Sequence, residues 1–316
     1  MIQSPGTEIA QGPLAQAALP DPAAIAGLEP IERIRRRWPL ILGGALTLLM
    51  IAALARELFG SGLGALQRAV PVHPLFWLAF AAYYFAPPAF DYLIFRRLWR
   101  IPFSGLAALN KKRISNEVLL GYSGEAYFYA WARQRTQMVA APFGAIKDVT
   151  ILSAIAGNAM TLAMILVAAP FSEELPREIG PGAVYASAAL VVAMSVPFLV
   201  FARRVFSLPR RMLWWVFGMH MARILFVNIC LVATWRFALP GVEIGTWLFL
   251  CAMRLLSSRL PLVPNKELLF ASFAMLLLGQ DAILSELTAV IAALTLLVHV
   301  VLMIGFSIRG LIKGRL

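Results

Sequence analysis

The chain has 316 residues, of which 60% are hydrophobic and 14% charged, and its formal net charge is +12. A soluble globular domain of this length does not need so large an apolar fraction, so the composition indicates a polytopic membrane protein. The basic residues lie in short clusters between apolar runs, a distribution that argues against a nucleic-acid-binding face.

The first segment, residues 1–37, is rich in Ala, Pro and Gly and becomes basic between Arg33 and Arg37. It has no apolar core long enough for a signal peptide, so we expect a disordered, basic, cytoplasmic tail rather than a cleaved leader. Residues 38–316 are predicted to form one helical membrane domain.

Six apolar runs in that domain are long enough to cross a bilayer, since a helix of about 20 residues spans a hydrocarbon core of about 30 Å. Two further apolar segments are interrupted by Gly, Pro and charged residues. Broken backbone in a bilayer must be covered by protein or face a water-filled cavity, so these two segments are predicted to be re-entrant hairpins or discontinuous helices. The predicted spans are 38–58, 74–95, 148–169, 183–202, 212–235 and 286–307, and the interrupted segments are 114–132 and 244–279.

The distribution of basic residues predicts the topology, because cytoplasmic loops carry the excess of Lys and Arg. If both interrupted segments return to the side from which they came, most of the 28 basic residues fall on one side. That side receives the cluster at Arg96, Arg97 and Arg100 and the cluster from Lys111 to Arg113. The pattern places both termini in the cytoplasm and the protein in a plasma membrane or bacterial inner membrane.

The same arrangement predicts an inverted repeat. The halves, about 38–170 and 183–308, begin on opposite sides of the membrane, and each contains one broken element. In folds of this kind the broken elements meet near the bilayer midplane and form the substrate site. The fold expected is therefore an all-α bundle of about six transmembrane helices with two re-entrant or broken elements.

Polar residues of the two broken segments are the predicted substrate site. An ionisable residue at the bilayer centre costs a few kcal/mol, so one that is present is paired, faces a cavity or has a function. A spacing of i, i+3 adds His220 and Arg223, which extend the polar path unless Arg223 snorkels. Asp91 is instead expected to pair with Arg96 or Arg97. The predicted site consists of Asn116, Glu117, Glu125, Arg254, Arg259, Lys266 and Glu267, with His220 and Arg223 beside them.

At these motifs the chain resembles the flippase-like membrane region of lysylphosphatidylglycerol synthases, and the stand-alone membrane proteins built from that region. The resemblance extends from about residue 40 onward and implies lipid translocation or handling. Because the chain ends at Leu316 without an acyltransferase-type domain, aminoacyl-lipid synthesis is not expected. The matching residues are Asn116, Leu119, Gly121, Gly124 and Glu125, then Pro261, Pro264 and Glu267; the sequence departs from the family at Leu120, Phe128, Asn265 and Lys266.

The mixture of charges suggests how such a site would work. Arg254, Arg259 and Lys266 suit a lipid phosphate, and three carboxylates, Glu117, Glu125 and Glu267, suit an amine. The sequence therefore predicts a flippase-like protein whose partner is a phospholipid or related amphiphile, with no nucleic acid, cofactor or metal. Catalytic motifs are missing, which argues against an enzyme. A membrane-embedded enzyme acting on a lipid head group and a non-catalytic scaffold stay open as alternatives, as does a homo-oligomer.

Overall fold

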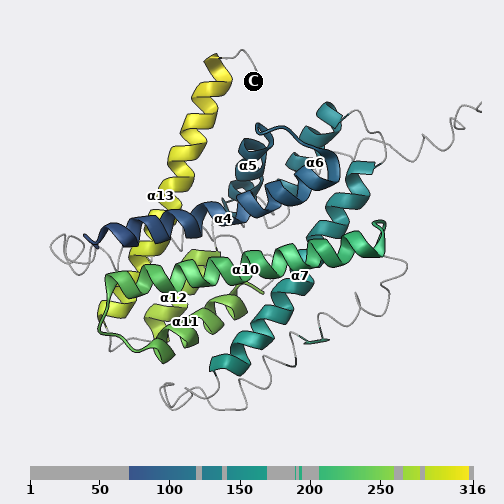
Figure 1. Ribbon diagram of the computed structural model, residues 1–316. Helices are drawn as coiled ribbons and strands as arrows, with labels where there is room; N and C mark the ends of the chain where they lie inside the picture. The colour runs from purple at the N-terminus through teal and green to yellow at the C-terminus, as the bar shows by residue number, and fades with distance from the viewer. Residues whose placement is uncertain are drawn as a thin grey trace, which may run out of the picture. The chain divides into compact units, whose positions relative to one another are not determined.

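The computed structural model describes residues 71–118, 123–136, 141–168, 206–259, 266–277 and 282–312, together with residues 189 and 192–193. All of these ranges belong to one compact unit, residues 40–316. The described residues form eight helices and no strands, which confirms the all-α prediction for this part of the chain (Figure 1). The helices are α4 (Pro74–Trp99), α5 (Gly105–Val118), α6 (Ser123–Thr136), α7 (Ala141–Ala168), α10 (Arg210–Ala238), α11 (Ile244–Ser257), α12 (Lys266–Leu277) and α13 (Ala282–Ile312).

Four of these helices are long and apolar enough to cross a membrane: α4, residues Phe143–Ala168 of α7, α10, and residues Glu286–Phe306 of α13. They coincide with four of the predicted spans, so the coarser expectation of a multi-pass helical membrane protein is met. The predicted span 38–58 lies outside the described residues, as does 183–202 apart from three positions. Six spans and an inverted repeat therefore stay predictions.

Helix α4 shows how local sequence sets the ends of a span. The Nδ1 atom of His73 accepts a hydrogen bond from the backbone N–H of Leu75 at 3.2 Å, and Pro74 begins the helix, where its missing N–H costs nothing. The helix runs through Pro87 and Pro88 and ends at Arg100, which has a left-handed conformation with φ 52°. The basic residues of its last turn complement the helix dipole.

Helices α4 and α10 run side by side in opposite directions and contribute to both larger hydrophobic clusters of the bundle (Figure 1). His73, just before α4, stacks on Phe237 near the end of α10, while Arg97 near the end of α4 lies over Trp215 near the start of α10. A stacked pair, Trp235 and Trp247, with ring centroids 5.5 Å apart, joins α10 to α11 within one of these clusters. Helix α7 packs against both α10 and α11, and α12 packs against α13.

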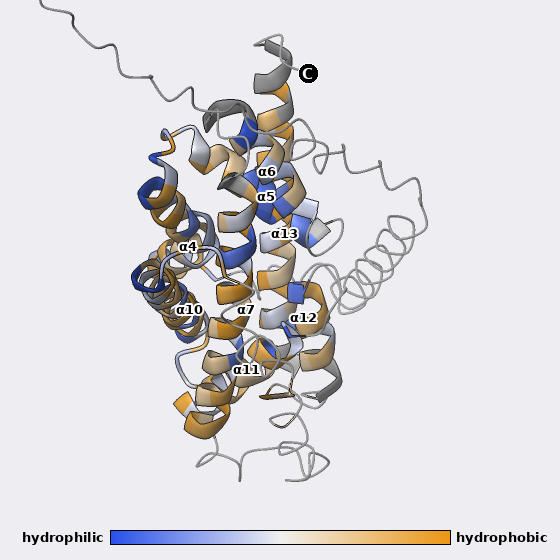
Figure 2. Cartoon of the chain, turned by 90° about the vertical axis from the view of Figure 1, so that its right-hand side faces the viewer, coloured by the Kyte–Doolittle hydropathy of each residue, from blue (hydrophilic) through white to orange (hydrophobic). Residues whose placement is uncertain are grey.

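Each interrupted segment is a pair of shorter helices. The first, predicted over 114–132, is the pair α5 and α6, which begins nine residues earlier, at Gly105, and packs helix against helix. The second, predicted over 244–279, is the pair α11 and α12. Figure 2 shows hydrophilic residues gathered on α5 and α6, in contrast to the largely hydrophobic α11.

Candidate functional site

Asn116 holds helices α5 and α6 together. Its Oδ1 atom accepts a hydrogen bond from the backbone N–H of Gly124 at 2.7 Å, in the first turn of α6. Nearby, the Ser123 hydroxyl lies 2.9 Å from the Ser115 hydroxyl and donates to the Ser115 carbonyl. A Cβ atom on Gly124 would lie 2.0 Å from the carbonyl oxygen of Lys112, so only glycine permits this approach. Asn116 therefore positions α6 and, with it, Glu125.

An ionic cluster joins five helices around Asp91 of α4. Its carboxylate lies 3.0 Å from the Lys112 ammonium of α5 and 2.8 Å from the Arg223 guanidinium of α10. Lys112 also lies 3.5 Å from Glu125 of α6, and Arg223 donates to the Ser153 hydroxyl of α7 at 2.8 Å. The second carboxylate oxygen of Glu125 is buried and accepts no hydrogen bond from any described residue. We call these four charged residues, Asp91, Lys112, Glu125 and Arg223, the Asp91 cluster.

One expectation about the residues of the Asp91 cluster is wrong, and one of two open alternatives is excluded. Asp91 does not pair with the arginines at its own helix end: Arg96 donates to the Tyr92 hydroxyl, and Arg97 lies over the Trp215 ring. Arg223 does not snorkel, because its partners, Asp91 and Ser153, lie in the interior. His220, one turn before Arg223 on α10, is also buried, and its Nε2 atom donates to the Val149 carbonyl of α7 at 3.1 Å.

Glu117 is the centre of a second set of contacts. Its Oε1 atom accepts from Arg113 at 2.7 Å, four residues earlier on α5, and its Oε2 atom lies 2.9 Å from Nε2 of His299 on α13. The contact with His299 is an ion pair when the imidazole is protonated. Arg113 also donates to the backbone carbonyl of Tyr84 and lies over its ring. Glu117 therefore links α5 to α13 and, through Arg113, to α4.

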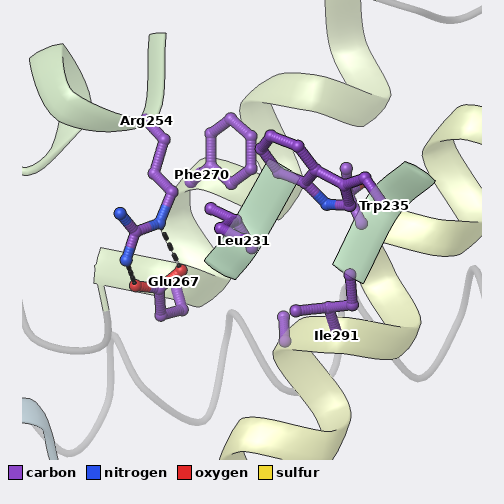
Figure 3. A pocket seen from close by; sticks show the side chains of 8 residues that line it. Leu231, Trp235, Arg254, Glu267, Phe270 and Ile291 are labelled. Carbon is purple, nitrogen blue, oxygen red and sulfur yellow. Dashed lines mark hydrogen bonds and ion pairs between the residues drawn. The ribbon is translucent and has the colours of Figure 1, made fainter. Parts of the chain in front are cut away.

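The second broken element contains a closed ion pair. Arg254 of α11 donates two hydrogen bonds to the carboxylate of Glu267 on α12, one of them 3.0 Å long, and a third to the Tyr83 hydroxyl at 3.1 Å. The pair borders a cavity of about 10 Å³, roughly the space that one water molecule needs. Figure 3 shows the ion pair on one side of this cavity, with Phe270 and Leu231 between it and Trp235.

Two further cations meet at Ser258, where α11 ends. The Arg259 guanidinium donates to the Ser258 hydroxyl at 2.8 Å and approaches the Ala154 carbonyl of α7 at 3.5 Å, and the Lys266 ammonium donates to the Ser258 carbonyl at 2.5 Å. Among the described residues no carboxylate forms an ion pair with Lys266. A Cβ atom on Gly157 would lie 2.1 Å from Nη1 of Arg259, so the guanidinium rests directly on α7.

The two broken elements approach each other across two adjacent residues of α4. The Tyr83 hydroxyl contacts Arg254 of the second element, whereas the Tyr84 carbonyl contacts Arg113 of the first. Through these contacts α4 borders both the Arg254–Glu267 pair and the Arg113–Glu117 pair. Seven of the nine predicted residues are thus divided into four groups around the core helices, while Asn116 joins α5 to α6 and His220 contacts α7. Glu125 and Arg223 belong to one, Glu117 to the next, Arg254 and Glu267 to the third, and Arg259 and Lys266 to the last.

Several residues of these groups were not predicted as parts of the site. Lys112 and Arg113 were expected in a cytoplasmic loop; instead they lie in α5 with side chains only 11% and 12% exposed, because each is held by a carboxylate. The spacing of Arg113 and Glu117, i and i+4, was a usable signal for that pair. Tyr83, Tyr84 and His299 carry no comparable sequence signal, because their partners lie on other helices.

The described residues define the class of the protein. It is a helical protein with four apolar helices of the kind found in multi-pass membrane proteins, and it has ion pairs in its interior. In comparisons with known proteins, no family, curated protein or solved structure matches it. No group of three or more metal-ligating side chains occurs within the described ranges.

Proposed function

We propose that this protein accommodates a phospholipid or similar amphiphile and carries its head group across the bilayer along the charged interior. The observation that best supports this proposal is that Arg254 of α11 and Arg113 of α5 contact Tyr83 and Tyr84. These tyrosines lie near the middle of α4, an apolar helix long enough to span a membrane. An ion pair far from water is weak evidence for stability, because desolvation offsets the attraction between the charges. Several such pairs among apolar helices suit a polar path.

The chemistry of the groups fits both parts of a head group. Arg259 and Lys266 present two cations around Ser258, and an anionic phosphate would gain charge-assisted hydrogen bonds from both. The buried second oxygen of Glu125 offers an acceptor for an ammonium or a hydroxyl. The acyl chains would stay in the hydrocarbon layer, so only the head group would have to cross.

The conformation described here is closed. The cavity beside Arg254 and Glu267 is far smaller than a head group, since its volume is about 10 Å³. Passage therefore requires α11 and α12 to separate and their ion pair to open, while the incoming phosphate takes the place of Glu267 on Arg254. In this proposal the ion pair is a gate. An arriving head group lowers the free-energy cost of breaking it.

Lipid scrambling in proteoliposomes tests the proposal. The wild-type protein should exchange fluorescent phospholipids between leaflets faster than empty liposomes do. Glu117→Gln should slow this exchange at equal folded content. Glu267→Gln removes the carboxylate that closes the gate on Arg254 and should speed the exchange, whereas Glu243→Gln, at an exposed carboxylate just before α11, should leave it unchanged. Reversal of the pair, Arg254→Glu with Glu267→Arg, separates gate chemistry from folding, because it keeps both charges but moves the cation from α11 to α12.

Other outcomes would favour other functions. Chemical modification of the added lipid, without transbilayer movement, would indicate a membrane-embedded enzyme. No movement with a broad lipid panel, and variants that alter only stability, would indicate a non-catalytic scaffold.

A further inference from the structure

One end of the bundle carries exposed arginines from two helices. The antiparallel pairing of α4 and α10 brings the last turn of α4 beside the first turn of α10, where Arg97 lies 4.4 Å from the centroid of the Trp215 ring. Five arginines are exposed there: Arg96, Arg97, Arg100, Arg210 and Arg211. The start of α7 lies at the same end, because Lys147 approaches the Ser207 hydroxyl at 3.4 Å. We call this surface the basic end.

Exposed aromatic rings surround the arginines of the basic end. Phe103, which follows α4, is 74% exposed, Trp214 of α10 is 73% exposed and Phe143 of α7 is 61% exposed. Phe103 packs edge-on against Tyr92, and Phe143 against Tyr129, so these rings are held at the surface by other aromatic residues. Aromatic rings beside basic residues are typical of the level at which a membrane protein meets lipid head groups.

Within the described ranges, no carboxylate at the basic end is free to neutralise its charge. Asp148 is fully buried and accepts hydrogen bonds from the backbone N–H groups of Ser207 and Leu208 at 2.6 and 2.7 Å. Asp91 lies in the interior with Lys112 and Arg223. The exposed arginines therefore present an uncompensated positive surface.

Arg100 provides an independent sign of function. It ends α4 in the left-handed conformation, with φ 52° and ψ 38°, a position where glycine is the favoured residue because a Cβ atom is strained there. Its backbone N–H donates to the Arg96 carbonyl, an interaction that glycine would keep. The chain thus accepts backbone strain at a site where only the side chain distinguishes arginine from glycine.

We propose that the basic end is a binding surface for the head groups of anionic phospholipids. Arginine forks bind phosphate oxygens in pairs, and the flanking rings enter the acyl boundary beside them. The surface would hold this end of the bundle against a negatively charged leaflet. It lies apart from the interior ion pairs, so the inference is independent of lipid translocation.

Binding can be measured by native mass spectrometry of the full-length protein in detergent, titrated with phosphatidylglycerol or with phosphatidylcholine of the same acyl chains. The wild type should bind phosphatidylglycerol more tightly. Each exposed arginine removed from the basic end should weaken this binding about fivefold. Arg211→Gln is compared with Arg236→Gln, which removes an exposed arginine from the last turn of the same helix, at its other end.

Arg100→Gly separates the loss of a side chain from a defect in folding. Because glycine relieves the strain at this position, the variant should fold at least as well as the wild type while binding phosphatidylglycerol about fivefold more weakly. Equal binding of the two lipids by the wild type would overturn the inference. So would an unchanged affinity of Arg100→Gly, or an equal loss in Arg236→Gln.

Discussion

The guanidinium of Arg223 on α10 lies 2.8 Å from the carboxylate of Asp91 on α4, 132 residues earlier in the chain. Lys112 shares the same carboxylate, so one anion holds two cations from two other helices. All three side chains are less than one-fifth exposed. Asp91 therefore joins α4 to both α5 and α10.

Asp91→Asn should strongly destabilise the protein. The substitution keeps the size of the side chain but leaves Lys112 and Arg223 as neighbouring buried cations, and breaking a buried ion pair in this way costs about 3–5 kcal/mol. Denaturant titration in mixed micelles measures the change in the free energy of unfolding. Arg236→Gln, at an exposed position, should change it by less than about 0.5 kcal/mol. A loss below about 1 kcal/mol for Asp91→Asn would show that solvent screens the Asp91 cluster.

Gly124→Ala should separate α5 from α6. The added Cβ atom would lie 2.0 Å from the Lys112 carbonyl oxygen, which is backbone and cannot turn aside. Overpacking of this kind costs about 1–3 kcal/mol, and it would also break the hydrogen bond from Gly124 to Asn116.

Gly218→Ala on α10 is the matched control for Gly124→Ala, because no atom lies within 4 Å of the Cβ position there. Its higher helix propensity should stabilise the protein by up to about 1 kcal/mol. The two substitutions are chemically identical, so opposite shifts of the unfolding midpoint are expected. Shifts of the same sign would contradict the close approach of α5 and α6.

The elements that could be predicted from the sequence are those whose cause is local. Four apolar runs become helices that are somewhat longer than predicted, and each of the two interrupted segments contains two shorter helices. Hydrophobicity and backbone breakers act within a few residues, so a single sequence contains the information. The beginning of α5 at Gly105 was missed because its basic residues read as a loop.

The candidate site could be predicted only as a list of residues. Asn116, Glu117, Arg254 and Glu267 were identified because ionisable or polar groups in apolar segments are rare. Their partners were not, because a contact such as that of Glu117 with His299 depends on how α5 packs against α13. The assignment of Asp91 to Arg96 or Arg97 failed for the same reason. It considered only cations near Asp91 in the sequence, whereas Lys112 and Arg223 come from other helices.

Asp148 connects α7 to the segment just before α10. It lies within α7, seven residues after Ala141, and its carboxylate accepts hydrogen bonds from the backbone N–H groups of Ser207 and Leu208 just before α10. Asp148→Ala should remove two charge-assisted hydrogen bonds, each contributing about 1.5–3 kcal/mol. Faster amide hydrogen exchange at Ser207 and Leu208 would report the loss. Asp148→Asn keeps one acceptor oxygen and should give intermediate rates; rates equal to wild type in Asp148→Ala would rule out this connection between α7 and α10.

Gly157 on α7 offers a way to move Arg259 without changing its charge. A Cβ atom there would lie 2.1 Å from Nη1, but that atom is the far end of a flexible side chain, so Gly157→Ala should displace the guanidinium and cost under about 1 kcal/mol. If Arg259 and Lys266 bind a lipid phosphate together, separating them should slow lipid scrambling as much as Arg259→Gln does. Gly305→Ala on α13, where no atom lies within 4 Å, controls for the substitution itself. Wild-type scrambling in Gly157→Ala, with Arg259→Gln impaired, would mean that the charge of Arg259 acts from more than one position and that its contact with α7 is dispensable.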